Sequence, residues 1–162
     1  MGDAERVFVG LGANVGDALA SVRDALDRLG DPPRIRVVAV SSLYRSAPVD
    51  AAGPDYVNAV AELRTRLTPP ALLAQLQAIE RRAGRERPYH HAPRTLDLDL
   101  LLFGGRAIAS PSLTVPHPRL ALRAFVLMPL AELAPQLRLA DGRSVAQALA
   151  ALGVQRIEKI DE

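Results

Sequence analysis

The segment that most constrains the fold is PRTLDLDLLLF, residues 93–103, in which polar and apolar residues alternate. Such alternation is typical of a β-strand with one face in a core, because successive side chains of a strand point to opposite faces. The alternating leucines then share the buried face. Asp97 and Asp99 project together from the other face, about 6.6 Å apart along the strand. The sequence therefore predicts a strand that is anchored in a core and carries two neighbouring carboxylates at its rim.

The rest of the chain alternates between strand-like and helix-like patterns. We expect strands over 6–12, 34–44 and 56–63, helices over 18–29, 68–84, 119–128 and 144–153, and a hairpin from 104–105 toward 106–110. The order βαββαβ predicts an α+β, ferredoxin-like fold, an antiparallel sheet flanked by helices in an αβα layering. A length of 162 residues suits one domain over 1–162.

Composition excludes several classes of protein. The chain has no cysteine, so it has neither a disulfide nor a cysteine-ligated zinc site. No apolar run is long enough for a transmembrane helix, and the N-terminus does not resemble a signal peptide. The net charge of +2 does not suggest a general polyanion binder. We therefore expect a cytoplasmic monomer that binds neither nucleic acid nor a membrane.

Two aspartates at this spacing are suited to hold a pair of divalent metal ions in phosphoryl transfer. The alternative is a strand whose solvent-exposed face carries two aspartates that bind no metal. The preceding segment, 81–94, favours the metal site because it holds five arginines and two histidines against Glu86 alone. Cations beside metal-bound carboxylates are expected where a polyphosphate lies between them. Taken alone, that segment could also be a solvated basic loop.

Other residues suggest a pocket for a planar ligand. Tyr56 and Asn58 have the same parity in one predicted strand, so a ring and an amide share a face, and Phe125 could supply a second ring. Both aromatic residues could equally be ordinary core. His117, between two prolines, could aim a donor at a phosphate or be structural. The glycine-rich GLGANVGD, residues 10–17, is either a ligand-contacting turn or a helix entry.

Glu80 is placed unusually, because a carboxylate in the last turn of a helix opposes the helix dipole. It pairs with a nearby arginine or serves the site. Two other functions were compared with the phosphoryl-transfer interpretation. An RNA-binding module on the same topology needs exposed aromatic residues on its central strands, and the sequence lacks that run. A metal-dependent phosphohydrolase could use the same two carboxylates, but it does not account for a planar-ligand pocket.

These motifs together resemble a known family. GLGANVGD, SSLYRSAPV, PDYVNAV, PRTLDLDLLLFG and LTVPHPRLALRAFVLMPLAELAP are similar to segments of 6-hydroxymethyl-7,8-dihydropterin pyrophosphokinase of folate biosynthesis. The resemblance covers about residues 6–140. It implies transfer of the pyrophosphoryl group of ATP to the hydroxymethyl group of the pterin, with release of AMP.

The resemblance also implies roles for individual residues. Two Mg²⁺ ions would be held by Asp97 and Asp99, and Arg85, Arg94 and these aspartates would be the catalytic group. ATP would contact Gln77, Arg87, Arg94, Leu100, Thr114, His117 and Arg123. The pterin would contact Ser46, Val49, Tyr56, Asn58, Asp97 and Phe125. The basic loop 85–93 would close over both substrates and exclude water.

Overall fold

The structure is a computed structural model that describes residues 4–14, 16–47, 54–84, 96–153 and 155–160. Its elements, in chain order, are β1 (Glu5–Ala13), α1 (Ala18–Leu29), β2 (Ile35–Val40), β3 (Tyr44–Ser46), β4 (Tyr56–Thr65), α2 (Pro69–Gly84), β5 (Asp97–Phe103), β6 (Ile108–Ala109), β7 (Thr114–Val115), the 3₁₀ helix η1 (Leu120–Leu122), α3 (Ala124–Leu133), α4 (Val145–Ala151) and β8 (Ile157–Lys159).

One antiparallel sheet organises the molecule. Its strands lie in the order β5-β1-β4-β3-β8, and β2 pairs with the other half of β4, in line with β3. If β2 and β3 are counted as one interrupted strand, the elements from β1 to β5 follow the ferredoxin-like order βαββαβ. The predicted α+β, ferredoxin-like fold is therefore confirmed.

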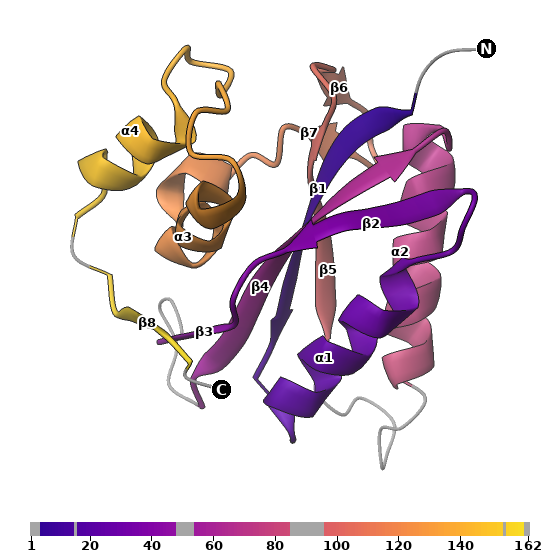
Figure 1. The fold of residues 1–162 in the computed structure, drawn as a ribbon, viewed down its shortest axis with the longest axis horizontal. Coiled ribbons are helices and arrows are strands. Elements are labelled where there is room, and N and C mark those ends of the chain that lie inside the picture. Colours follow the sequence, from indigo (N-terminus) through magenta and orange to yellow (C-terminus); the bar gives the residue numbers. More distant parts are fainter. Residues whose placement is uncertain (1–3, 15, 48–53, 85–95, 154, 161–162) are drawn as a thin grey trace.

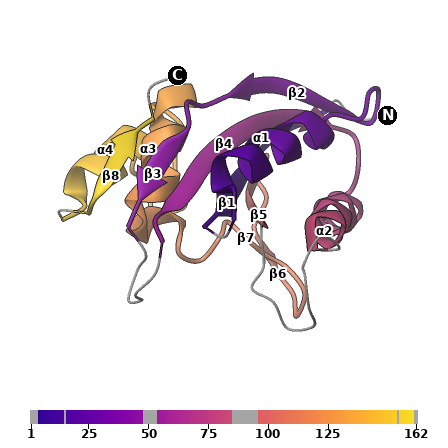
Figure 2. The ribbon, with the colours of Figure 1, turned by 90° about the horizontal axis from the view of Figure 1, so that it is seen from below.

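Helices cover both faces of this sheet (Figures 1 and 2). Helices α1 and α2 pack on one face, where Leu98 and Leu100 of β5 join a core with Leu29 and Leu76. Helices α3 and α4 cover part of the other face through a second core. Its residues include Phe8, Val60, Leu101, Leu127, Leu130 and Val145. The predicted αβα layering follows from this division of apolar side chains between two faces.

Local capping explains why several helices begin and end where the sequence predicts. The Asp17 side chain accepts a hydrogen bond from the Ala20 N–H (3.0 Å) and starts α1, which ends before Gly30. Ser144 and Gln147 form a capping box at α4. The Thr68 hydroxyl accepts from the Ala71 N–H (3.3 Å) at the start of α2. Side-chain acceptors satisfy N–H groups that the first turn of each helix leaves unpaired.

Three predicted elements differ from the structure. The single strand expected over 34–44 is two strands, because the Ser41 hydroxyl accepts from the Val60 N–H (2.9 Å) and interrupts the pairing. The expected hairpin from 104–105 is wrong: β6 pairs with β7, closed by mutual bonds between Ser110 and Leu113. The helix expected over 119–128 is η1 followed by α3, with an extended backbone at Arg123.

Strand β8 was not expected from the sequence, because three residues show too little periodicity to identify a strand. It extends the sheet beyond β3, so that Lys159 lies opposite Tyr44. Among the residues described, no helix has the length and apolar character needed to cross a membrane.

Candidate active site

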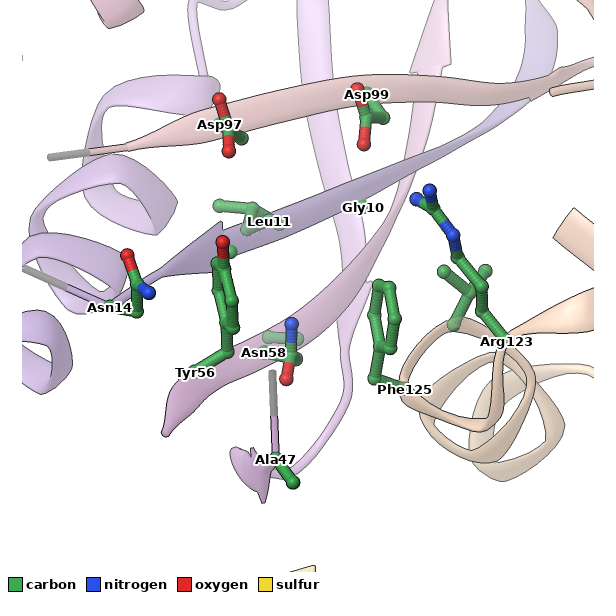
Figure 3. Close-up of a pocket in the computed structure, with 13 residues that line it drawn as sticks. Gly10, Leu11, Asn14, Ala47, Tyr56, Asn58, Asp97, Asp99, Arg123 and Phe125 are labelled. Atoms are coloured by element: carbon green, nitrogen blue, oxygen red, sulfur yellow. The ribbon is translucent and has the colours of Figure 1, made fainter. Parts of the chain in front are cut away.

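The two aspartates lie on the face of β5 that the sequence predicts. Leu98 and Leu100 are buried against α1 and α2, whereas Asp97 and Asp99 are half-buried and face a cavity of about 300 Å³. This cavity is on the same sheet face as α3, at the end that the helix does not fill (Figure 3). The strand's period of two therefore separates its structural face from its polar face.

Two glycines of β1 form the floor of the cavity. Gly12 lies opposite Asp97 on one side and opposite Asn58 on the other, and Gly10 lies opposite Asp99. A Cβ added at Gly12 would come within 3.3 Å of the Asn58 Nδ2 atom, and one at Gly10 within 3.4 Å of Leu101. The missing side chains keep the space between the aspartates and the amide open.

The aromatic pair is brought together from distant parts of the chain. Tyr56 begins β4 and Phe125 lies in the first turn of α3, and both line the cavity with Asn58. Figure 3 shows the two rings on either side of the Asn58 side chain, with the Tyr56 hydroxyl directed toward Asp97. A flat molecule can therefore lie between the rings and meet a polar group along one edge.

Asn58 is held in one orientation by Ser46. The buried Ser46 hydroxyl donates a hydrogen bond of 2.6 Å to Asn58 Oδ1, and both side chains are buried. The Asn58 Nδ2 group lies toward Gly12 and the cavity, so it is available as a donor. Ser46 itself lines a neighbouring cavity of about 480 Å³, which shares Ala47, Arg123 and Phe125 with the first.

Cationic and neutral donors lie at the aspartate side of the cavity. Arg123 lines it, with its guanidinium carbon 5.2 Å from the centre of the Phe125 ring and its tip directed toward Asp99 in Figure 3. His117 does not line the cavity, but it is close enough to Asp99 and Arg123 to interact electrostatically with both. The arrangement places donors where a phosphate chain would pass the aspartates.

The protonation state of His117 follows from its surroundings. Burial lowers the pKa of His117 below its ordinary value; Asp99 opposes this shift, and Arg123 and Arg119 add to it. The Arg119 N–H donates to His117 Nδ1 (3.2 Å), so a neutral ring carries its proton on Nε2. In its neutral form, which the lowered pKa favours, His117 is therefore a donor through Nε2.

Glu80 supports the strand that carries the aspartates. Its Oε2 atom accepts a hydrogen bond of 2.8 Å from the backbone N–H of Leu98, the residue between Asp97 and Asp99. Because β5 is the edge strand of the sheet, this N–H needs a partner outside the ladder. This bond gives Glu80 a structural role in holding β5, and the two explanations offered for it from the sequence both stay predictions.

The remaining predicted contacts are placed less centrally. Leu100 is buried in the core with α1 and α2, whereas Gln77 on α2 and Thr114 on β7 are exposed. Their predicted contacts with ATP stay predictions. Val49, Arg85, Arg87 and Arg94 lie outside the described residues, as does the basic loop 85–93.

Seven further residues line the cavity: Gly10, Leu11, Gly12, Asn14, Ala47, Ala59 and Val126. Sequence reasoning assigned none of them an individual role, and the four in residues 10–17 were covered only by the expectation of a ligand-contacting turn or a helix entry. Gly10 and Gly12 belong both to the expected strand 6–12 and to the glycine-rich segment 10–17, and they have the parity of Phe8 in β1, so they share its face of the sheet. Two small residues on one face of a buried strand were the available signal. Nothing in the sequence pattern distinguishes Asn14 or Ala47 from other loop residues.

The residues that could hold a metal ion are Asp97 and Asp99. Within the described residues, no group of three or more histidine, aspartate or glutamate side chains is placed to hold one. Two carboxylates nevertheless fit Mg²⁺, because this ion keeps several waters and is commonly bound by one or two carboxylates together with substrate phosphates. The half-buried position of both carboxylates beside an open cavity is consistent with that mode.

Comparisons with known proteins agree with this geometry. A protein of Pseudomonas aeruginosa named 2-amino-4-hydroxy-6-hydroxymethyldihydropteridine pyrophosphokinase is 49% identical over 157 residues, covering 96% of this chain and 97% of the relative. A protein of the same name from Methylorubrum extorquens is 40% identical over 157 residues, covering 96% and 99%.

Solved structures share the fold. A crystal structure of HPPK-DHPS in complex with substrates matches with a TM-score of 0.75 and 10% identity, over 93% of this chain and 43% of that one. Wild-type Plasmodium falciparum HPPK-DHPS with pterin and p-hydroxybenzoate matches with a TM-score of 0.73 and 12% identity, over 93% and 43%. Residues 8–135 match the family described as 7,8-dihydro-6-hydroxymethylpterin-pyrophosphokinase, and the chain is therefore a pyrophosphokinase that belongs to this family.

Proposed function

We propose that this enzyme transfers the pyrophosphoryl group of ATP to 6-hydroxymethyl-7,8-dihydropterin, with Asp97 and Asp99 holding two Mg²⁺ ions. The observation that carries the proposal is one cavity that combines two facing rings, a fixed amide donor and two carboxylates. The rings and the amide suit a flat heterocycle with hydrogen-bonding edges. The carboxylates and nearby donors suit a metal-bound triphosphate.

The residues divide into two groups by substrate. Tyr56 and Phe125 stack on the pterin, and Asn58 donates from Nδ2 to an acceptor on its edge while Ser46 holds the amide. The pterin would lie with its hydroxymethyl group toward the aspartates, the side of the cavity to which the Tyr56 hydroxyl also points. Binding between two rings restricts the pterin to one plane and so orients its reacting oxygen.

The second group acts on ATP. Asp97 and Asp99 would hold the Mg²⁺ ions, which would neutralise charge on the phosphates and orient the β-phosphorus. Arg123 contributes a fixed positive charge, and His117 contributes a neutral N–H donor. The hydroxymethyl oxygen bonds to the β-phosphorus, the bond from that phosphorus to the α–β bridging oxygen breaks, the hydroxyl proton is released, and AMP leaves.

Four broader expectations remain predictions. We propose that residues 1–162 form a single domain, and the continuous sheet from β1 to β8 supports this. We also propose that the enzyme works as a monomer in the cytoplasm and binds no nucleic acid.

The product of ATP turnover tests the function. Purified protein with Mg-ATP and 6-hydroxymethyl-7,8-dihydropterin should form AMP and the pterin diphosphate in equal amounts, and no AMP without the pterin. ADP as product, or phosphate release without the pterin, would instead indicate a phosphohydrolase on the same carboxylates. Chromatography of the nucleotides separates these outcomes in one experiment.

A further inference from the structure

The C-terminal arm, residues 155–160, lies beyond the part of the chain that matches the family, residues 8–135. It contains β8, which pairs with β3 (Figure 1), and its first residue, Gln155, bonds to the start of α3. Its first two residues bond to segments that carry the cavity. Gln155 contacts both sides of Arg123, and Arg156 contacts Asp55, the residue before Tyr56. The arm therefore contacts the supports of both rings.

The start of α3 has an unusual requirement for such support. Arg123 is the N-cap residue of α3, and its side chain makes no capping hydrogen bond. Arginine is not among the residues that cap helices well, and a cation at a helix N-terminus opposes the dipole. The guanidinium instead lies over Phe125 and points toward Asp99. The position is thus occupied by a residue suited to the site and unsuited to starting a helix.

Gln155 supplies the missing cap from 31 residues away. Its Oε1 atom accepts from the Ala124 N–H (2.9 Å), and its Nε2 atom donates to the carbonyl oxygen of Leu122 (3.0 Å). One carboxamide therefore binds the backbone immediately before and immediately after Arg123. This clamps the junction between η1 and α3, where the backbone of Arg123 is extended. The Arg123 carbonyl already accepts the first hydrogen bonds of α3, from the N–H groups of Val126 (3.0 Å) and Leu127 (2.9 Å), so Gln155 completes the pairing on the N–H side of the junction.

We propose that Gln155 is a positioning residue, which caps α3 in place of Arg123 and so sets the orientation of Arg123 and Phe125 in the cavity. The inference rests on the proposed function, because it assigns a role through the pterin- and phosphate-binding side chains. Arg156 adds a weaker connection: it forms an ion pair with Asp55 (3.0 Å), and its carbonyl accepts from the Ala47 N–H (3.2 Å). Its side chain is 75% exposed, so the ion pair contributes little.

The test is a steady-state comparison of two glutamine variants. Gln155→Ala removes the α3 cap, whereas Gln147→Ala removes a similar bond at the start of α4, where Gln147 Oε1 accepts from the Ser144 N–H (2.8 Å). Gln147 does not line the cavity, so it is a matched control for lost helix capping. Both variants should lower Tm by about 2–4 °C.

Only Gln155→Ala should change substrate binding. We expect its KM for the pterin, and its Kd for the pterin measured with α,β-methylene-ATP, to rise about three- to tenfold, because the two hydrogen bonds that hold the start of α3 are lost. Gln147→Ala should stay within twofold of wild type. A purely structural role for Gln155 would lower the active fraction, and hence kcat, without changing KM.

Several results would overturn the inference. They are an unchanged pterin KM in Gln155→Ala, an equal rise in Gln147→Ala, or a larger rise in Arg156→Ala than in Gln155→Ala. The last result would place the support at Asp55 instead. If wild-type protein forms no AMP, the proposed function fails; if it does and the variants behave alike, only the role of Gln155 fails.

Discussion

At the scale of single residues, the site depends on the two aspartates that share a face of β5. Their side chains reach the cavity only because the leucines between and after them are buried on the other face. The backbone N–H of Leu98 is bound by Glu80, which fixes the strand between them. Charge, not packing, is therefore the property that these two positions contribute.

Removing either charge should abolish most turnover. Asp97→Asn and Asp99→Asn keep the shape of the side chain but remove the negative charge that attracts Mg²⁺. We expect kcat to fall by at least about a hundredfold, the equivalent of ~2.7 kcal/mol, with little change in Tm. The rate should be measured over a wide range of Mg²⁺ concentration. Near-normal rates at saturating Mg²⁺ would show that the metal assignment is wrong.

Gly12 matters to the proposed site because it has no side chain and so leaves room beside Asn58. The new Cβ of Gly12→Ala would lie 3.3 Å from Asn58 Nδ2, and Asn58 cannot easily move because Ser46 binds its Oδ1 atom. The pterin KM should therefore rise about tenfold, which corresponds to ~1.4 kcal/mol of binding.

Gly105→Ala is the control for this substitution, because a Cβ there meets nothing within 4 Å. It should leave the pterin KM unchanged. If both glycine variants bind the pterin like wild type, Asn58 does not read the pterin edge from the position described.

At the scale of elements, α3 is joined to the sheet by hydrogen bonds to β3 and to the segment between β2 and β3. Glu132, near the end of α3, accepts hydrogen bonds from the Tyr44 hydroxyl (2.7 Å) and the Ser42 N–H (2.8 Å). Burial raises the pKa of Glu132, but these hydrogen bonds and the charge of Lys159 outweigh it, so the pKa lies below its ordinary value. The ionised carboxylate therefore joins α3 to the break between β2 and β3.

The stabilisation by Glu132 should depend on pH. Because its folded-state pKa is depressed, its contribution is present above the unfolded-state value of about 4.3 and is lost as the pH falls through the folded-state value. Glu132→Gln should lower the unfolding free energy by about 1 kcal/mol at pH 7. The loss is smaller than for a buried charged group because Glu132 is exposed and solvent screens its charge.

Urea unfolding at several pH values measures this effect. The difference between wild type and Glu132→Gln should be constant from about pH 6 to 8 and should shrink below about pH 4. Glu158→Gln on β8 is a control at another exposed glutamate, and it should change stability by less than about 0.5 kcal/mol. A wild-type-minus-mutant difference that grows in acid would contradict the assigned direction of the pKa shift.

At the scale of the whole molecule, one sheet separates two cores and leaves a cavity where the second core ends. The face with α1 and α2 is covered along β1, β4 and β5, whereas α3 and α4 cover only part of the other face (Figure 2). The aspartates lie on the part that these helices leave open. The candidate site thus occupies the part of this face that the second core leaves uncovered.

Several helices of this fold could be predicted from the sequence of each segment alone. The helices expected over 18–29 and 68–84 are confirmed, the second with its start one residue later at Pro69, because caps, glycines and a 3.6-residue period all indicated these limits. The break in the strand at 41–43 could not be predicted, because it depends on a bond from Val60 to the Ser41 hydroxyl across strands. The pairing of β6 with β7 and the existence of β8 likewise depend on partners distant in sequence.

By itself, the sequence determined which side chains of β5 and β4 share a face, because a strand has a fixed period of two residues. It also determined, through its motifs, the family to which the chain belongs. Only the tertiary structure decided that Phe125 faces Tyr56 across Asn58, that glycines form the floor between them, and that Gln155 caps α3. These contacts join segments many residues apart, and periodicity acts only within a segment.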